Sequence, residues 1–190
     1  MTAARQAIDL VLAGHEPHPA LAIDRHWGMA AANRAVAPLV AGVDPALLRP
    51  PVNVLRLSLH PAGLAPRTVN LTEWRAHLLE RLRQQIEISA DPVLVELMAE
   101  LRGYGVSTGS TPHAGPDFSA VAMPFRLATA GGILSFFSTT TVFGTPVDVT
   151  LSELALECFF PADQATVQAM RRLTSQMEPE AARSRGRSHR

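Results

Sequence analysis

The sequence predicts a single α+β domain in which an antiparallel sheet has helices packed on one face. The first observation is size, because 190 residues, 47% hydrophobic and 18% charged, are enough for one packed core. The second is a change in the apolar period from 3.6 to 2 near residue 119, which separates helices from strands. The third is an apolar hairpin at residues 20–32, ahead of the helices. We therefore expect both ends of the chain to supply strands to one sheet.

The N-terminal elements follow from apolar spacing and cap residues. Apolar residues at helical spacing over 3–13, closed by Gly14, predict an amphipathic helix. In the hairpin, two apolar stretches flank a polar turn at 24–26. Asn33 is a residue type that caps helix starts, so we expect it to cap a helix over 33–40.

Two short helical segments are expected next. Asp44 followed by Pro45 is typical of a cap with proline at the first helical position, which starts a helical turn. Asn53 opens a short helix that ends at Pro61. The alternation of apolar residues over 52–59 fits a strand nearly as well, so both readings stay open at this point.

The clearest helix begins after Asn70, which forms a capping pair with Glu73. Its apolar stripe consists of Leu71, Trp74, Leu78, Leu82 and Ile86. A second helix runs from Asp91 to Gly103, and the composition of residues 105–117 predicts a loop after it.

The C-terminal part predicts a three-stranded antiparallel meander followed by a helix. The strands are expected within 119–129, 133–143 and 149–160, with Val121 on the core face of the first. The last helix runs from Asp163 through Met170. We expect the ordered domain to cover residues 1–175, and residues 176–190 to form a disordered basic tail.

Composition excludes several classes of function. The formal net charge is zero, so the chain as a whole has no electrostatic attraction for nucleic acid or anionic membranes. We expect no membrane span and no signal peptide, and therefore a cytoplasmic protein. The single cysteine, Cys158, excludes an internal disulfide, and we expect it to be a buried, inert thiol. The seven histidines lack metal-ligand spacing, so we expect no metal and no cofactor.

Three stretches of the chain together resemble a known family. "LAIDRHWGMAAANRA" resembles the opening of a PAS-like domain, with a strand, an acidic turn, a strand and an asparagine before a helix. With "NVLRLSLHPAGLAPRTVNLTEWRAHLLERLR" and "LSFFSTTTVFGTPVDVTLSELALECFFPAD", the chain from about Ala7 to Met170 resembles the MmyB-like ligand-binding domain. In transcription regulators that domain follows an Xre-type helix-turn-helix.

The resemblance implies a PAS-like sheet with an enclosed apolar pocket that holds a fatty acid or a similar small molecule. In such regulators the state of the pocket biases DNA binding by the attached helix-turn-helix. We see no helix-turn-helix domain in this chain, so DNA contact is expected only through a helix-turn-helix outside it.

Ten residues are the candidates for contact with a ligand. Aromatic faces suit an apolar ligand. Arg56 is the preferred anchor for a ligand carboxylate, because a charge between two leucines needs a partner, although an internal carboxylate would satisfy it equally. The candidates are Trp27, Leu55, Arg56, Leu59, His60, Trp74, Leu78, Phe125, Phe136 and Thr139.

Two alternatives to a ligand sensor remain open. The first is a small α+β pocket enzyme that uses His60 or His77. We expect no enzyme, because the sequence has no GxSxG, no glycine-rich phosphate loop and no paired-carboxylate motif. The second is a dimerisation module, a homodimer without ligand, in which side chains fill the space between helices and sheet. It predicts a small, dry cavity and an apolar outer face on the first helix or the sheet edge.

Overall fold

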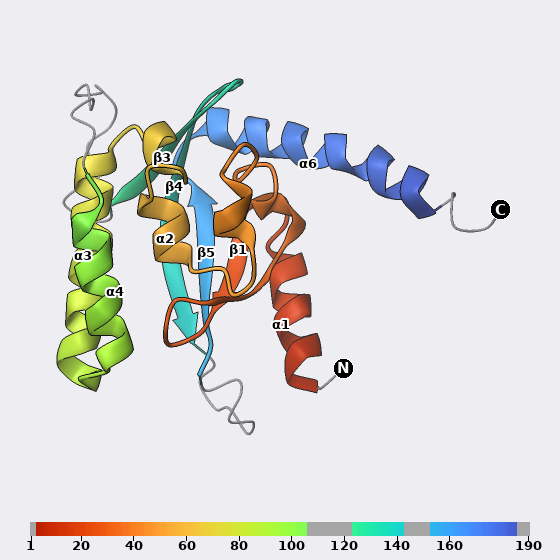
Figure 1. Cartoon of the computed structure of the whole chain (residues 1–190). Helices are drawn as coiled ribbons and strands as arrows, with labels where there is room; N and C mark the ends of the chain where they lie inside the picture. The colour runs from red at the N-terminus through yellow and green to blue at the C-terminus, as the bar shows by residue number, and fades with distance from the viewer. Residues whose placement is uncertain (1–2, 106–122, 143–152, 186–190) are drawn as a thin grey trace.

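A single antiparallel sheet organises the protein. The computed structural model of the chain describes residues 3–105, 123–142 and 153–185. Within these residues, five strands form a sheet in the order β2-β1-β5-β4-β3 (Figure 1). The strands are β1 (Ala20–Ile23), β2 (Met29–Ala32), β3 (Pro124–Thr129), β4 (Gly132–Val142) and β5 (Ala155–Pro161). Because β1 pairs with β5, the α+β prediction with one sheet built from both ends of the chain is confirmed.

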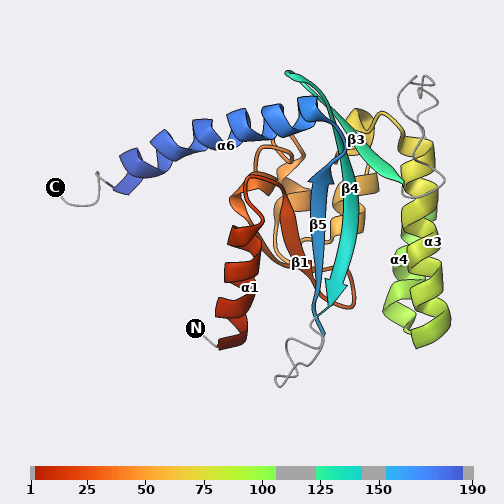
Figure 2. The same ribbon diagram turned by 180° about the vertical axis from the view of Figure 1, so that it is seen from behind.

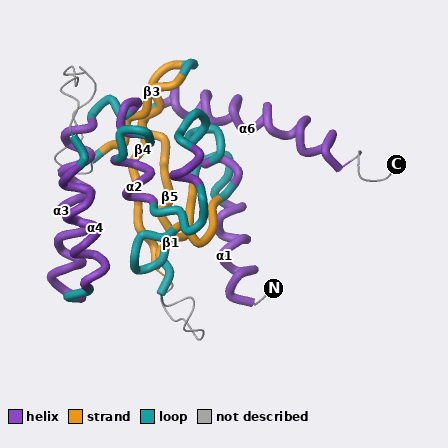
Figure 3. The backbone as a smooth tube through the Cα atoms, viewed as in Figure 1, coloured by secondary structure: helices purple, strands orange, loops and turns teal. Residues whose placement is uncertain are grey.

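A layer of helices covers one face of this sheet, as predicted. The layer consists of α2 (Val54–Leu59), α3 (Leu71–Ser89) and α4 (Pro92–Gly103), with α3 and α4 side by side (Figures 1 and 3). The main apolar core lies between these helices and the sheet. The segment after Asn53 is thus a helix and not a strand.

Side-chain caps explain where several of these helices begin. The Asn53 Oδ1 atom accepts hydrogen bonds from the backbone N–H groups of Leu55 and Arg56, both at 3.1 Å. The Asp91 carboxylate accepts one from Val93 at 2.9 Å. Asp44 caps the 3-10 turn Pro45–Leu48 in the same way. These caps satisfy donors that the first helical turn leaves without intrahelical partners.

Asn33 and Asn70 precede helical segments as predicted, but their side chains do not cap them. The Asn33 amide instead donates to the carbonyl of His18 at 2.8 Å, and its Oδ1 accepts from the Ala20 N–H at 3.1 Å. The Asn70 amide donates to the Pro124 carbonyl at 2.7 Å. The predicted caps were wrong because each amide joins two distant segments. The expected helix over 33–40 is only the 3-10 turn Arg34–Val36.

The opposite face of the sheet carries α1 (Ala3–Gly14), in addition to the helical layer that was predicted (Figures 1 and 2). Ile8 and Leu12 are buried there in a second apolar cluster. The other buried residues of this cluster are Ala20 and Ala22 of β1, Leu156 of β5, and Leu154 just before β5. The two central strands β1 and β5 therefore have apolar side chains on both faces, which is why a helix is needed on each side.

The C-terminal helix α6 (Gln164–Arg185) starts at one end of the sheet (Figure 2). The Ser135 N–H of β4 donates to the Thr166 hydroxyl at 2.9 Å, which fixes its first turns. Its backbone stays helical past residue 175, where we expected a disordered tail, because alanine, glutamate and arginine in that stretch favour helix. Val121, most of the predicted loop at 105–117, and residues 186–190 lie outside the described residues.

Candidate functional site

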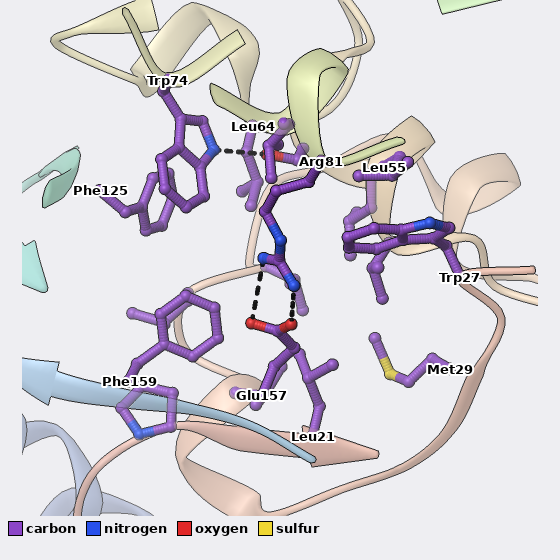
Figure 4. A pocket seen from close by; sticks show the side chains of 18 residues that line it. Leu21, Trp27, Met29, Leu55, Leu64, Trp74, Arg81, Phe125, Glu157 and Phe159 are labelled. Atoms are coloured by element: carbon purple, nitrogen blue, oxygen red, sulfur yellow. Dashed lines mark hydrogen bonds and ion pairs between the residues drawn. The ribbon is translucent and has the colours of Figure 1, made fainter. Parts of the chain in front are cut away.

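A cavity of about 90 Å³ lies between the helical layer and the sheet. Eighteen residues line it (Figure 4). Most are aliphatic or aromatic, and they come from β1, β5, α2, α3 and the segments between them. The interior of this domain therefore offers an apolar space in the position that the sequence predicted.

Five of the ten predicted ligand contacts line this cavity. They are Trp27, Leu55, Trp74, Leu78 and Phe125. Four of them were predicted from apolar or aromatic character combined with position on a helix or strand, and Trp27 was predicted as an aromatic residue that follows a polar turn. Their side chains come from both layers, which is what an enclosed cavity between two layers requires.

Arg56, the predicted anchor, lies outside the cavity lining. Its guanidinium makes a bidentate contact with Glu100 of α4, with Nε–Oε1 at 2.9 Å and Nη2–Oε2 at 2.7 Å. The hydrogen bond from Arg56 lowers the pKa of Glu100, and the Tyr104 hydroxyl also donates to this carboxylate. Burial, followed by the contact with Glu100, raises the pKa of Tyr104 to about 12. An internal carboxylate thus pairs with Arg56, the alternative that the sequence left open.

The other four candidates also lie away from the cavity lining. The His60 Nδ1 atom accepts a hydrogen bond from the Ala62 N–H at 3.0 Å, and its ring packs edge-on against Tyr104. Leu59 and Phe136 are fully buried in the main core. Thr139 is exposed on β4, where it pairs with Cys158 of β5.

An ion pair between Arg81 of α3 and Glu157 of β5 crosses the cavity (Figure 4). The Arg81 Nη2 atom lies 2.5 Å from Glu157 Oε1, and Nη1 lies 3.5 Å from Oε2. The Thr140 hydroxyl accepts from Arg81 at 2.8 Å and donates to Glu157 at 2.7 Å. The Glu157 side chain is only 6% exposed. A carboxylate at this depth needs these partners, because burying an unpaired charge is costly.

Trp27 packs against this ion pair from one side. Its ring centroid lies 4.9 Å from the guanidinium carbon of Arg81, within range for a cation–π interaction. The indole N–H donates to Gln85 Oε1 at 2.8 Å. Trp27 has a φ of 65°, which is uncommon for a bulky residue and requires support from its surroundings. The hydrogen bond from its N–H to the Asp24 carbonyl, at 3.0 Å, gives part of that support.

Trp74 closes the other side of the cavity (Figure 4). Its indole N–H donates to the Ser58 hydroxyl at 3.0 Å, and its ring packs against Phe125 with centroids 5.0 Å apart. The His77 ring stacks on Trp74, with ring centroids 5.5 Å apart, and His77 does not line the cavity. Burial, and then the positive charge of Arg81, lowers the pKa of His77.

A second, polar hollow of about 280 Å³ shares Trp27 and Arg81 with the apolar cavity. Arg25 and Glu153 line this hollow, with Arg25 Nη1 3.5 Å from Glu153 Oε1. Both arginines that line the two spaces are therefore paired with carboxylates.

The sequence did not identify Arg81 and Glu157 as site residues. The spacing Trp74, Leu78, Arg81 is a helical column that places all three toward the sheet, and this signal was available. Glu157 alternates with the apolar residues Leu156 and Cys158 in the predicted last strand, and this spacing alone does not show what it contacts. Since β5 is a central strand covered on both faces, a glutamate there must be paired.

Cys158 is half-buried, and not fully buried as expected. Burial and the charge of Glu157 raise the pKa of its thiol, which disfavours the reactive thiolate. In the part of the chain that the structure describes, no three histidine, cysteine, aspartate or glutamate side chains come together as metal ligands would. No helix in that part is both long enough and apolar enough to span a bilayer.

The fold and the cavity together define an α+β domain with an apolar cavity between its sheet and its helices. Comparison with protein families gives a specific result, a match over residues 4–173. The chain belongs to the family of MmyB-like transcription regulator ligand binding domains. This confirms the resemblance noted in the sequence. A search of curated proteins found no match.

Proposed function

We propose that this domain is the sensor of a cytoplasmic transcription regulator with a PAS-like architecture. It binds a small apolar molecule, such as a fatty acid, and modulates DNA binding by an attached or partner helix-turn-helix of the Xre type. The observation that carries this proposal is the apolar cavity between the helical layer and the sheet, in a member of a regulator ligand-binding family.

The size of the cavity means that a fatty acid could bind only with a change of arrangement. An engineered cavity of about 150 Å³ holds benzene, and pockets for drug-sized ligands measure about 300–1,000 Å³. At about 90 Å³, this cavity is too small for an alkyl chain of a fatty acid. Such a ligand would bind an expanded arrangement and not the present one. Unequal binding to two arrangements is the condition for a population shift.

Strand β5 offers a physical connection between the cavity and α1. Glu157 faces the cavity, and the adjacent Leu156 packs in the cluster that holds Ile8 and Leu12 of α1. Expansion of the cavity that moves β5 would therefore also move the surface on which α1 rests. We propose α1 as the output element that passes the ligand state to the DNA-binding part.

Native mass spectrometry of the purified protein, followed by organic extraction, tests the proposed ligand binding. We expect an added mass that extraction identifies as a fatty acid or similar lipid. A bare chain mass that stays bare after incubation with an excess of medium-chain and long-chain lipids would contradict the proposal.

The substitution Leu10→Asp tests the output element. Leu10 is 73% exposed on α1, so the change leaves the core intact. In the regulator that carries the helix-turn-helix, we expect L10D to abolish the effect of ligand on DNA binding, whereas Q6D, at another exposed position of α1, retains it. An unchanged ligand effect in L10D argues against α1 as the output.

A dimerisation module without ligand is a second candidate, and two observations favour it. The cavity is small, and α1 exposes Leu10 at 73% and Val11 at 44%. This candidate predicts a ligand-free homodimer in the native mass spectrum, which L10D converts to monomers. The enzyme alternative gains no such support, because His60 and His77 both lie outside the cavity lining.

A further inference from the structure

The charges in the cavity balance each other. Of the residues that line it, only Arg81 and Glu157 are charged, and they pair with each other across the space (Figure 4). Arg81 links α3 to β5 through this contact, and the Thr140 hydroxyl joins both partners. A ligand that enters the apolar space therefore meets a neutral pair and not a cation in need of an anion.

A ligand carboxylate has two ways to bind here, and both are unfavourable. It can lie next to Glu157, where two negative charges in a buried site repel each other. Alternatively, it can take Arg81 for itself and leave the Glu157 carboxylate buried without its cation. In the neighbouring polar hollow, Arg25 lies 3.5 Å from Glu153 and is 63% exposed, so it is a hydrated surface cation and not a buried anchor for a carboxylate.

An uncharged polar head avoids both problems. The Oε2 atom of Glu157 has only a long contact with Arg81, at 3.5 Å, so it retains lone pairs for another donor. A hydroxyl or a primary amide can donate to that oxygen without breaking the ion pair. Hydrogen bonds to a charged acceptor are stronger than those between neutral groups.

From this geometry we infer that the cavity selects amphiphiles with an uncharged, hydrogen-bond-donating head over the corresponding carboxylates. Glu157 is the residue that determines this specificity. The inference rests on the proposed function and narrows its ligand, from small apolar molecules that include fatty acids, to an alkyl alcohol or amide. A fatty acid binds more weakly, because its carboxylate competes with Glu157 for Arg81.

The test compares three probes of equal chain length, octanol, octanamide and octanoate, by titration calorimetry near neutral pH. We expect the wild-type protein to bind octanol and octanamide at least about tenfold more tightly than octanoate. In E157Q, which keeps the shape but removes the charge, octanoate gains about tenfold or more because Arg81 then needs an anion. The control E153Q changes the charge of the polar hollow only, and we expect it to keep the wild-type ratio of octanol affinity to octanoate affinity.

Octanoate affinity equal to or above that of octanol in the wild-type protein overturns the inference. So does an unchanged ratio in folded E157Q. The wild-type ratio alone decides the matter if E157Q does not fold. If none of the three probes binds to the wild-type protein, the inference fails, and the native mass spectra with medium-chain and long-chain lipids then decide the proposed function separately.

Discussion

Two arginine–glutamate pairs join the helices of this protein to their neighbours, and they lie at different depths. The Arg56–Glu100 pair links α2 to α4, with side chains 43% and 37% exposed. The Arg81–Glu157 pair links α3 to β5, with side chains 25% and 6% exposed. Both contain the same two functional groups. The comparison teaches that burial, and not the chemistry of the groups, decides how strongly each charge of such a pair depends on its partner.

The largest expected effect comes from breaking the buried pair with Arg81→Met. At neutral pH this change leaves the Glu157 carboxylate buried without its cation, and we expect a loss of about 3–5 kcal/mol in the free energy of unfolding. Urea denaturation measures it. Because Arg81 is a quarter exposed, the lower end of this range is expected.

Two further variants make the interpretation of R81M specific. The double variant R81M/E157M should recover most of the lost stability, because two apolar side chains replace the pair. The exposed Arg83 lies on the same helix, and R83M should change stability little. A loss below about 1 kcal/mol for R81M would mean that the buried pair behaves like a surface pair.

Breaking the more exposed Arg56–Glu100 pair should cost less stability. Glu100→Gln removes the charge but keeps the shape, and we expect a loss of about 0.5 kcal/mol at neutral pH because both side chains are more than a third exposed. Denaturation at several pH values measures it, with E96Q, an exposed position on the same helix, as the control.

The pH dependence of this pair has a definite sign. Arg56 lowers the pKa of Glu100 in the folded state, so the stabilisation is complete above the ordinary pKa of 4.5 and is lost as the pH falls through the folded value. The difference between wild type and E100Q should therefore disappear in acid. A difference that grows in acid contradicts the assignment.

The smallest expected effect is the influence of the Arg81 charge on the pKa of His77. Burial and the Arg81 charge lower the pKa of His77 below 6.5, so its neutral form is favoured in the folded state. Its contribution to stability is present above pH 6.5 and is lost as the pH falls from there. An NMR titration should show a midpoint below 6.5, which R81M raises only in part because burial remains. A midpoint at or above 6.5 in the wild type contradicts this description.

The sequence predicted the helices, the strands and much of the cavity lining, but not the partners in the two ion pairs. Periodicity and caps predicted α3, α4 and the meander, because local spacing determines which face of an element is apolar. The same reasoning found the apolar cavity residues Leu55, Trp74, Leu78 and Phe125, whereas Trp27 was found from its aromatic side chain after a polar turn. It identified that Arg56 needs a partner, but the choice between a ligand and Glu100 depends on contacts between residues 44 positions apart.

Arg81 and Glu157 were missed for the same reason. They lie 76 positions apart in the sequence, and their meeting depends on which strand is central in the sheet. For Asn33 and Asn70 the error was the opposite one, because the sequence predicted local helix caps that do not form. Both residue types are common caps, but long-range hydrogen bonds to Ala20 and Pro124 compete successfully with the local ones.

The two tryptophans of this chain are its only ones, and both line the same cavity from opposite sides. Trp27 lies against the Arg81 guanidinium, and Trp74 lies against Phe125 and His77. All of the indole emission of the protein therefore arises at the walls of this one space. The intrinsic fluorescence is a built-in, label-free optical reporter of whether the cavity is filled.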